Sequence, residues 1–239
     1  MFTLPLRPDL AVLQDRFTRD GFVQIPDLLS REDAATLHAE LRGRGDWVQV
    51  LTTDRGFAEL DRATRAGMSA AQREALDTAV YARARTGFQY RYETIRVPDA
   101  HAARAKSDDL LCALATFLSS DPVLDLLRQV TGSPDILFAD AQATAYAPGD
   151  FLTGHDDAFE GKNRRAAYVL NLTPSWRIEW GGLLLFHGAD GHVTRGLVPS
   201  FNTLNIFGVP LMHSVSEVTR ASPYRRYSVT GWLRAEPQP

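Results

Sequence analysis

The sequence predicts an α+β protein with a helix-rich first half and a strand-rich second half. In residues 1–132, apolar side chains recur at helical spacing, as at Leu10, Leu13 and Phe17. Residues 133–234 instead hold short apolar runs separated by glycine, proline and Asn/Asp turns, a pattern typical of an antiparallel barrel or sandwich. At roughly 150 residues per domain, the 239 residues allow one or two domains.

Local start and stop signals define the elements of the first half. Ser30 is a good N-cap, and Glu32 and Asp33 follow it in the first turn, where acidic side chains suit the helix dipole. Pro122 opens the last helix and Gly132 ends it, in the positions these residues prefer. The expected helices are 8–19, 30–42, 69–85, 108–118 and 122–130, and the expected strands are 21–26 and 88–96.

The second half is expected to consist of strands alone. The run Gly188-Ala189-Asp190-Gly191 predicts a hairpin turn between two of them. The expected strands are 136–146, 152–155, 166–172, 182–186, 193–195, 203–207, 213–218 and 224–234.

Composition excludes several classes of protein. Apolar residues make up 44% and charged residues 23%, which is ordinary for a globular chain, and no run approaches 18 apolar residues. The net charge of −3 comes without a basic stripe, so we expect no nucleic-acid and no membrane partner. The single cysteine, Cys112, and the lack of a visible secretory signal favour a reducing, cytoplasmic location.

The segment 146–157 holds the most informative polar residues. Because residues i and i+2 of a strand point to the same face, His155 and Asp157 would place an imidazole beside a carboxylate inside a barrel. Asp156 would then point the other way. A polar strand end would show the same pair, so the pair alone does not establish a metal site.

A second histidine, His213, starts a later expected strand. Two neutral histidines and one carboxylate on one face leave three positions open on an octahedral metal. This set of ligands is typical of non-haem Fe(II) oxygenases.

Arg226 lies on the last expected strand and shares a face with Ser228 by alternation. An arginine beside a hydroxyl on a barrel wall suits a buried carboxylate, because paired charge-assisted hydrogen bonds offset its desolvation. A solvated arginine at a strand end is the alternative, and Arg225 is adjacent. The parity of the strand favours Arg226.

Together these residues form one ordered pattern: Tyr146-x₂-Gly149-x₅-His155-x-Asp157, then His213, then Arg226-x-Ser228 before Trp232. Over about residues 136–234 the chain resembles the prolyl 4-hydroxylase-type Fe(II)/2-oxoglutarate dioxygenases. In detail it is similar to the ribosomal-protein prolyl hydroxylase subgroup and its bacterial relatives.

The resemblance implies a double-stranded β-helix (jelly-roll, cupin-like) core with supporting N-terminal helices. It implies His155, Asp157 and His213 as ligands of Fe(II). Arg226 would pair with the far carboxylate of 2-oxoglutarate, assisted by Tyr146 and Ser228. The implied cofactors and cosubstrates are Fe(II), 2-oxoglutarate and O₂, with ascorbate as a supporting reductant.

The implied reaction is hydroxylation of a C–H bond with release of succinate and CO₂. The resemblance favours a prolyl residue in a protein or peptide as the substrate. The same chemistry on a free amino acid or small metabolite is an alternative, and so is a cupin-like metal protein without 2-oxoglutarate turnover. All of these site residues fall between 146 and 228. We therefore expect one domain over 1–239, with 1–132 as helix-rich support and 133–234 as the jelly-roll core. The oligomeric state does not follow from the sequence.

Overall fold

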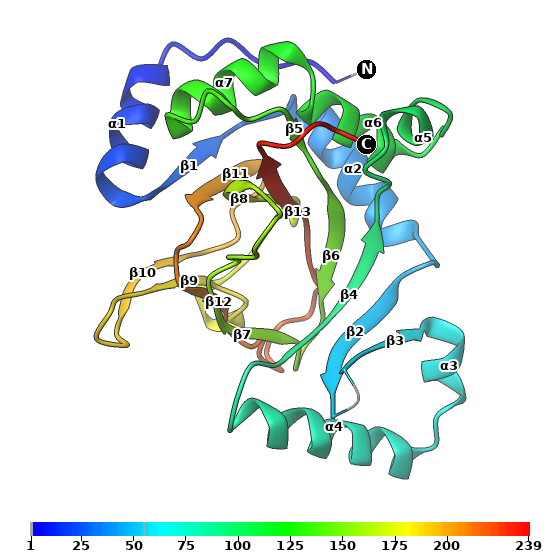
Figure 1. Cartoon of the computed structure of the whole chain (residues 1–239). Coiled ribbons are helices and arrows are strands. Elements are labelled where there is room, and N and C mark those ends of the chain that lie inside the picture. The colour runs from blue at the N-terminus through cyan, green and yellow to red at the C-terminus, as the bar shows by residue number, and fades with distance from the viewer. Residues whose placement is uncertain (1, 55) are drawn as a thin grey trace.

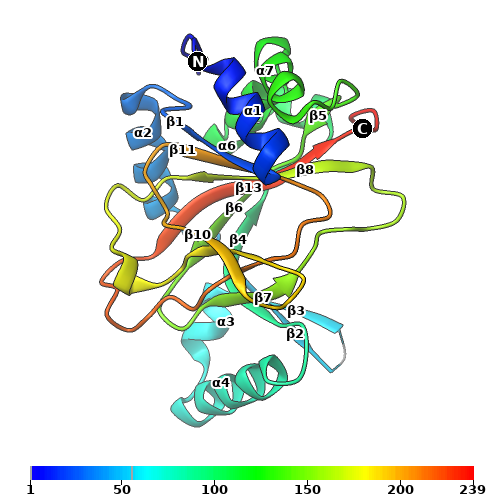
Figure 2. The same cartoon turned by 90° about the vertical axis from the view of Figure 1, so that its left-hand side faces the viewer.

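An antiparallel β-sheet that curls into a half-barrel forms the centre of the protein (Figure 1). The computed structural model describes residues 2–54 and 56–239. Helices cover the outer face of the sheet at one end, and both termini lie at that end (Figures 1 and 2). The expected α+β class and the double-stranded β-helix core are confirmed.

The helices largely begin and end where the local signals predicted. The Ser30 hydroxyl accepts a hydrogen bond from the Asp33 backbone N–H, and Gly132 ends its helix in the left-handed conformation. The helices are α1 (Leu10–Asp20), α2 (Arg31–Gly43), α3 (Arg62–Gly67), α4 (Ala70–Ala84), α5 (His101–Ala105), α6 (Leu110–Leu118) and α7 (Asp121–Thr131), with a 3₁₀ turn at Ile178–Trp180.

The strands pair in the order β1-β11-β8-β13-β6-β4-β7-β12-β9-β10, with β2 beside β4, β3 beside β2, and β5 beside β13. Their bounds are β1 (Phe22–Pro26), β2 (Val48–Thr53), β3 (Gly56–Asp61), β4 (Tyr90–Arg96), β5 (Phe138–Ala139), β6 (Gln142–Tyr146), β7 (Phe151–His155), β8 (Arg164–Asn171), β9 (Leu184–His187), β10 (Val193–Leu197), β11 (Thr203–Gly208), β12 (His213–Val215) and β13 (Arg226–Arg234). The predicted hairpin turn joins the antiparallel strands β9 and β10.

Two features of the sheet differ from expectation. The hairpin β2–β3 was not predicted, because β3 is largely exposed and depends on pairing with β2 rather than on buried alternation. The expected strand 136–146 is split into β5 and β6 at Asp140, whose carboxylate binds the backbone N–H of Trp232 and the guanidinium of Arg234.

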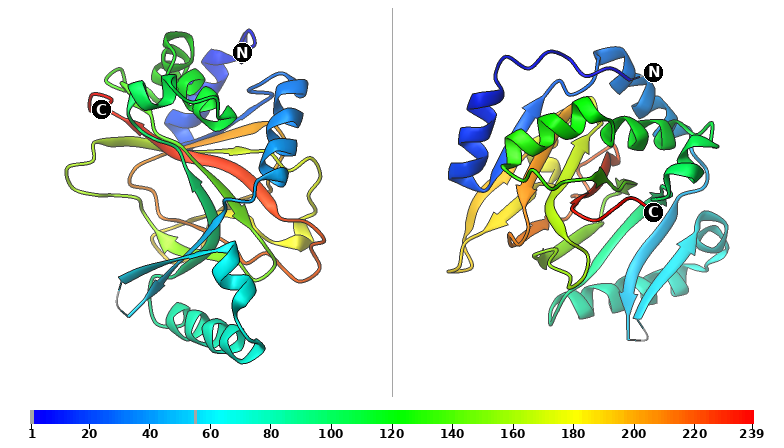
Figure 3. Two further views of the ribbon diagram at one scale, coloured as in Figure 1. Left: turned by 90° about the vertical axis from the view of Figure 1, so that its right-hand side faces the viewer. Right: turned by 45° about the horizontal axis from the view of Figure 1, so that its top comes forward.

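The main core lies between the helices and the outer face of the sheet. Leu124 and Leu127 of α7, Leu41 of α2 and Tyr227 of β13 are buried there. Figure 3 shows α2 lying along this face, and α6 and α7 crossing the end of the half-barrel. Helices α1, α2 and α5–α7 thus cover one side and one end of the sheet, and α4 packs at the opposite end (Figure 1). The concave side stays free for a site.

No single helix among residues 2–54 and 56–239 is long and apolar enough to cross a bilayer. The helices α6 and α7 reach the required length only together, across a bend of 54°.

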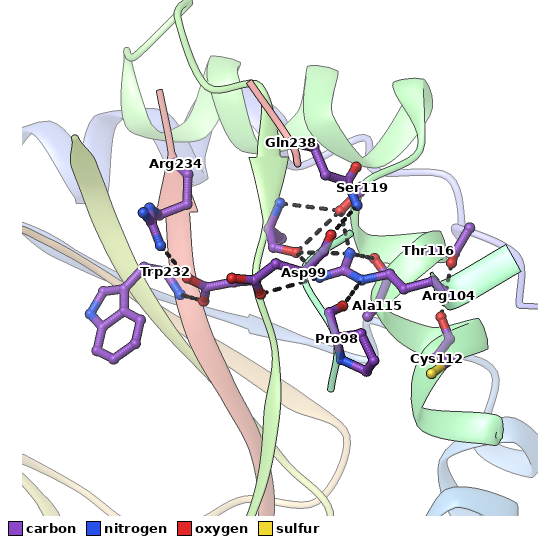
Figure 4. A network of polar contacts seen from close by, with 12 residues as sticks. Pro98, Asp99, Arg104, Cys112, Ala115, Thr116, Ser119, Trp232, Arg234 and Gln238 are labelled. Carbon is purple, nitrogen blue, oxygen red and sulfur yellow. Dashed lines mark hydrogen bonds and ion pairs between the residues drawn. The ribbon is translucent and has the colours of Figure 1, made fainter. Parts of the chain in front are cut away.

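A buried polar network joins the helices to the strand end at β5 and β13 (Figure 4). Arg104 donates hydrogen bonds to the carbonyl oxygens of Pro98, Ala115 and Ala139. Asp140 accepts from the Trp232 backbone N–H at 2.7 Å and from Arg234 Nη1 at 2.7 Å. Arg104 thus connects the carbonyl of Ala139, at the end of β5, with carbonyls of the helical region, so that this buried strand end has a hydrogen-bond partner.

Replacing Asp140 with alanine is expected to lower the free energy of unfolding by about 3 kcal/mol, because it removes the buried partner of Arg234. The expected loss is at the low end for a buried pair, since Glu236 also contacts Arg234. Urea unfolding at pH 7 measures it. The control is Asp135→Ala, which breaks the exposed pair with Arg165 and is expected to lose less than about 1 kcal/mol. Equal losses in the two variants would contradict the prediction.

Candidate metal centre

Three potential metal ligands come together on the concave side of the sheet. His155 ends β7 and lies directly opposite His213, the first residue of β12. Asp157 Oδ1 lies 3.5 Å from His155 Nε2, and Asp157 Oδ2 lies 3.5 Å from His213 Nε2. One candidate ligand atom from each residue lies within 4.8 Å of the others, a spacing suited to one metal ion.

The route by which Asp157 reaches the histidines differs from the prediction. β7 ends at His155, so Asp157 is not the next inward residue of a continuing strand. Its φ of 61° puts its backbone in the left-handed region, which non-glycine residues seldom adopt. A residue in the left-handed conformation beyond the end of β7, and not strand alternation, brings the Asp157 carboxylate beside the two histidines.

Backbone carbonyls orient both imidazole rings. His155 Nδ1 lies 3.0 Å from the carbonyl oxygen of Thr153, and His213 Nδ1 lies 2.8 Å from that of Leu211. A carbonyl oxygen only accepts, so each Nδ1 carries the proton and donates. The lone pair of each Nε2 is left facing Asp157, the arrangement found in histidines that bind a metal through Nε2.

The charges in the cluster favour a cation. Burial, followed by the nearby His155, lowers the pKa of His213 to about 4, so this ring is neutral at neutral pH. Burial alone would raise the pKa of Asp157, but the two histidines outweigh it and the pKa is lowered. Burial opposes protonation of His155, yet the Asp157 carboxylate outweighs it and raises the pKa of His155.

Arg226 is buried in the same cavity with no acidic partner. It faces Tyr146 across the β13–β6 pairing, with its guanidinium carbon 5.3 Å from the centre of that ring. Its one hydrogen bond runs from Nη2 to Asn171 Oδ1 at 3.4 Å, and Nε has no partner. Within the described part of the chain, no carboxylate lies within 4 Å of it, and burial lowers its pKa. An unpaired buried guanidinium is costly, and an incoming carboxylate would satisfy it.

Tyr146 and Ser228 take different places relative to the cavity. The buried Tyr146 lines it and stacks on Tyr92 at a centroid distance of 5.0 Å. The Ser228 hydroxyl lies 2.9 Å from Thr144 Oγ1, and Thr144 rather than Ser228 lines the cavity. Any effect of Ser228 on a bound molecule would therefore pass through Thr144.

The cavity has a volume of about 250 Å³ and an aromatic wall along β4. Phe88, Tyr90 and Tyr92 form this wall, with successive ring centroids 5.6 Å apart. Phe88 also lies 5.6 Å from the ring of His155 and is 47% exposed, so the wall extends from the ligand cluster to the surface.

Two further residues, Asn171 and Trp232, contribute to the site although they were not predicted as site residues. Asn171 hydrogen-bonds Arg226, and Trp232 lines the cavity. Alternation along β13 would have placed Trp232 on the face of Arg226, and Asn171 is a polar residue at the end of an apolar strand.

Comparison with known proteins agrees with this geometry. The family model described as the 2OG-Fe(II) oxygenase superfamily matches residues 141–234. The match covers less than half of the chain, and it spans the segment that holds the candidate ligands. The matched segment contains all six predicted site residues.

Proteins similar to the matched segment include prolyl hydroxylases. It is 38% identical over 101 residues to the prolyl 3-hydroxylase OGFOD1 of Mus musculus, covering 39% of this chain but only 18% of the mouse protein. The fold resembles a Pseudomonas putida prolyl-4-hydroxylase, with a TM-score of 0.60, 21% identity, and coverage of 94% of this chain and 98% of that one. It also resembles a prolyl hydroxylase from Trichoplax adhaerens solved with a hypoxia inducible factor peptide, with a TM-score of 0.61, 16% identity, and coverage of 95% and 89%.

The residues of the site fit the groups that the matched superfamily is named for, Fe(II) and 2-oxoglutarate. Two oriented Nε2 lone pairs and one carboxylate suit Fe(II), which accepts imidazole and carboxylate ligands. The unpaired Arg226 suits the distal carboxylate of 2-oxoglutarate.

Proposed function

We propose that the protein is an Fe(II)- and 2-oxoglutarate-dependent dioxygenase that hydroxylates a prolyl residue of a protein or peptide. The observation that carries the proposal is that Arg226, buried and without an acidic partner, lines the same cavity as the His155–Asp157–His213 cluster. A metal-binding protein that binds no small molecule with a carboxylate group would gain nothing from the buried charge of Arg226.

Each site residue has a task in this proposal. His155, Asp157 and His213 hold the iron, and the Nδ1 hydrogen bonds keep both imidazoles oriented for it. Arg226 binds the distal carboxylate of 2-oxoglutarate, while Tyr146 donates its hydroxyl to the same molecule. When bound, iron and 2-oxoglutarate supply the oxidation of a substrate C–H bond by O₂, with release of succinate and CO₂.

Two observations support a prolyl substrate. The OGFOD1 relative and the two solved structures are all named as prolyl hydroxylases, one of them bound to a peptide. The wall of Phe88, Tyr90 and Tyr92 offers flat apolar surfaces against which a pyrrolidine ring packs. Its exposed outer end at Phe88 suits a residue that enters on a longer chain.

The test begins with the purified protein under anaerobic conditions, mixed with Fe(II) and 2-oxoglutarate. A visible charge-transfer band is expected in the wild type and is expected to be lost in both Asp157→Ala and Arg226→Ala. Absence of the band in the wild type, or its persistence in both variants, would reject the proposed function.

The substrate is tested by turnover. Cell protein incubated with the enzyme, Fe(II), 2-oxoglutarate and O₂ is expected to gain about 16 Da on proline, the mass of one oxygen atom, together with succinate. Succinate formation stimulated by a free amino acid and not by protein would instead support a small-molecule substrate. A bound metal with no 2-oxoglutarate turnover would indicate a cupin-like protein.

We also propose that the enzyme works in a reducing, cytoplasmic compartment and that ascorbate supports its turnover. The only cysteine, Cys112, is free and buried, which suits a compartment that keeps iron ferrous. Expression of a tagged full chain followed by cell fractionation tests the location. Loss of turnover over time without ascorbate, and its recovery on addition, tests the reductant.

A further inference from the structure

A residue outside the ligand cluster holds the carboxylate of that cluster in place. We propose that Arg164 is a positioning residue that fixes the turn aiming Asp157 at His155 and His213, and that Trp232 holds Arg164 in turn. The inference rests on the proposed function, since it concerns the carboxylate that would bind the metal.

The backbone at Asp157 needs support from elsewhere in the chain. It lies beyond the end of β7, and residues 156–163 form neither helix nor strand. Its φ of 61° costs on the order of 1 kcal/mol or more for a residue with a Cβ. Without an outside contact, this segment would relax to an ordinary extended conformation, and the carboxylate would turn away from the histidines.

Arg164 provides that contact from the other end of the same loop. It is the first residue of β8, and its Nη1 donates a hydrogen bond to the backbone carbonyl oxygen of Asp157 at 2.9 Å. A hydrogen bond from a charged donor contributes about 1.5–3 kcal/mol, which is enough to offset the cost of the left-handed conformation.

The guanidinium of Arg164 is held by stacking and not by an ion pair. Its central carbon lies 3.6 Å from the ring centre of Trp232 and 6.0 Å from that of Phe159. In the part of the chain that the structure describes, no carboxylate oxygen lies within 4 Å of Arg164. A flat guanidinium stacks on an indole in a way that a lysine ammonium does not reproduce.

Trp232 is fixed by the sheet. Its backbone N–H donates to Asp140 Oδ1 at 2.7 Å, and the same carboxylate accepts from Arg234 (Figure 4). The backbones at positions 231 and 140 lie so close together that only glycine fits at position 231, where a Cβ would lie 2.1 Å from the Asp140 carbonyl oxygen. A continuous series of contacts therefore runs from rigid β13 through Trp232 and Arg164 to the backbone of Asp157.

The test measures the affinity of the full chain for Mn²⁺ alone, without 2-oxoglutarate. Arg164→Gln is expected to weaken Mn²⁺ binding about 10- to 100-fold, the usual effect of removing a residue that orients a ligand. Arg164→Lys keeps the charge but loses the stack, and is expected to weaken binding nearly as much. The matched control is Arg165→Gln, which alters the next residue, an exposed arginine paired with Asp135, and is expected to bind Mn²⁺ like the wild type.

A double-mutant comparison separates positioning from a general loss of structure. If Arg164 acts through Asp157, then adding Arg164→Gln to Asp157→Ala is expected to cause no further loss of Mn²⁺ affinity. An equal loss in both backgrounds would overturn the inference, as would wild-type affinity in Arg164→Lys. If Arg164→Gln does not fold, Arg164→Lys is compared in its place in the wild-type and Asp157→Ala backgrounds. Wild-type Mn²⁺ binding that does not depend on Asp157 would reject the proposed function itself, and with it the inference.

Discussion

Replacing Arg226 with methionine is expected to have opposite effects on 2-oxoglutarate binding and on stability. Removing one partner of a buried charge pair costs about 2–5 kcal/mol, so the KM for 2-oxoglutarate is expected to rise roughly 30- to 4000-fold. The free protein is expected to gain about 1–4 kcal/mol in its free energy of unfolding, because methionine removes a buried guanidinium without an acidic partner. Steady-state succinate assays and urea unfolding without ligands measure the two effects.

The adjacent arginine provides the control. Arg225, which directly precedes β13, contacts the buried carboxylate of Glu93, which Arg62 and Arg65 also contact. Arg225→Met is therefore expected to destabilise the protein by about 1–3 kcal/mol and to leave the KM for 2-oxoglutarate unchanged. If Arg226→Met destabilises the free protein as Arg225→Met does, Arg226 is a structural residue and not a ligand-binding one.

Replacing Asp157 with alanine is expected to have the second large effect. Its two oxygens lie 3.5 Å from the Nε2 atoms of His155 and His213, so the change removes one of three ligands and the only negative charge among them. Because even outer residues of metal sites contribute 10- to 100-fold in affinity, loss of this ligand is expected to weaken Mn²⁺ binding by on the order of 100-fold or more. Turnover of 2-oxoglutarate is expected to fall to background.

The matched control is the preceding residue, Asp156, whose carboxylate accepts from the backbone N–H of Ala158 rather than facing the histidines. Asp156→Ala is expected to bind Mn²⁺ within about twofold of the wild type, since surface changes away from a site have small effects. Isothermal titration of each variant measures the affinities. Similar losses in the two variants would show that charge near the cavity, and not coordination by Asp157, attracts the metal.

Much of the fold and of the candidate site follows from local sequence signals. Ser30 and Gly132 bound helices through contacts within a few residues of themselves, so their neighbours in the sequence suffice to predict them. The order of histidine, carboxylate, histidine and arginine identified the cluster, because ligand chemistry depends on residue type. Alternation along the last expected strand predicted that Arg226, and not Arg225, faces the cavity, because alternation depends only on the residues of one strand.

Contacts between distant segments decided the rest. His155 meets His213 because β7 and β12 pair in one register, and Asp157 joins them through a left-handed turn that Arg164 holds from the next strand. The hairpin β2–β3 forms an exposed flank whose stability comes from pairing rather than from its own pattern.

The sequence by itself therefore determined the class of fold, the helix ends and the chemical identity of the candidate ligands. The tertiary structure alone decided that Arg226 is buried without an acidic partner and that Ser228 contacts Thr144 rather than the cavity. It also decided that Arg164, stacked on Trp232, hydrogen-bonds the backbone of Asp157. The physical reason is the distance along the chain over which each kind of interaction acts. Caps, turns and alternation act over a few residues, whereas burial, register and charge pairing depend on which distant segments the folded sheet brings together.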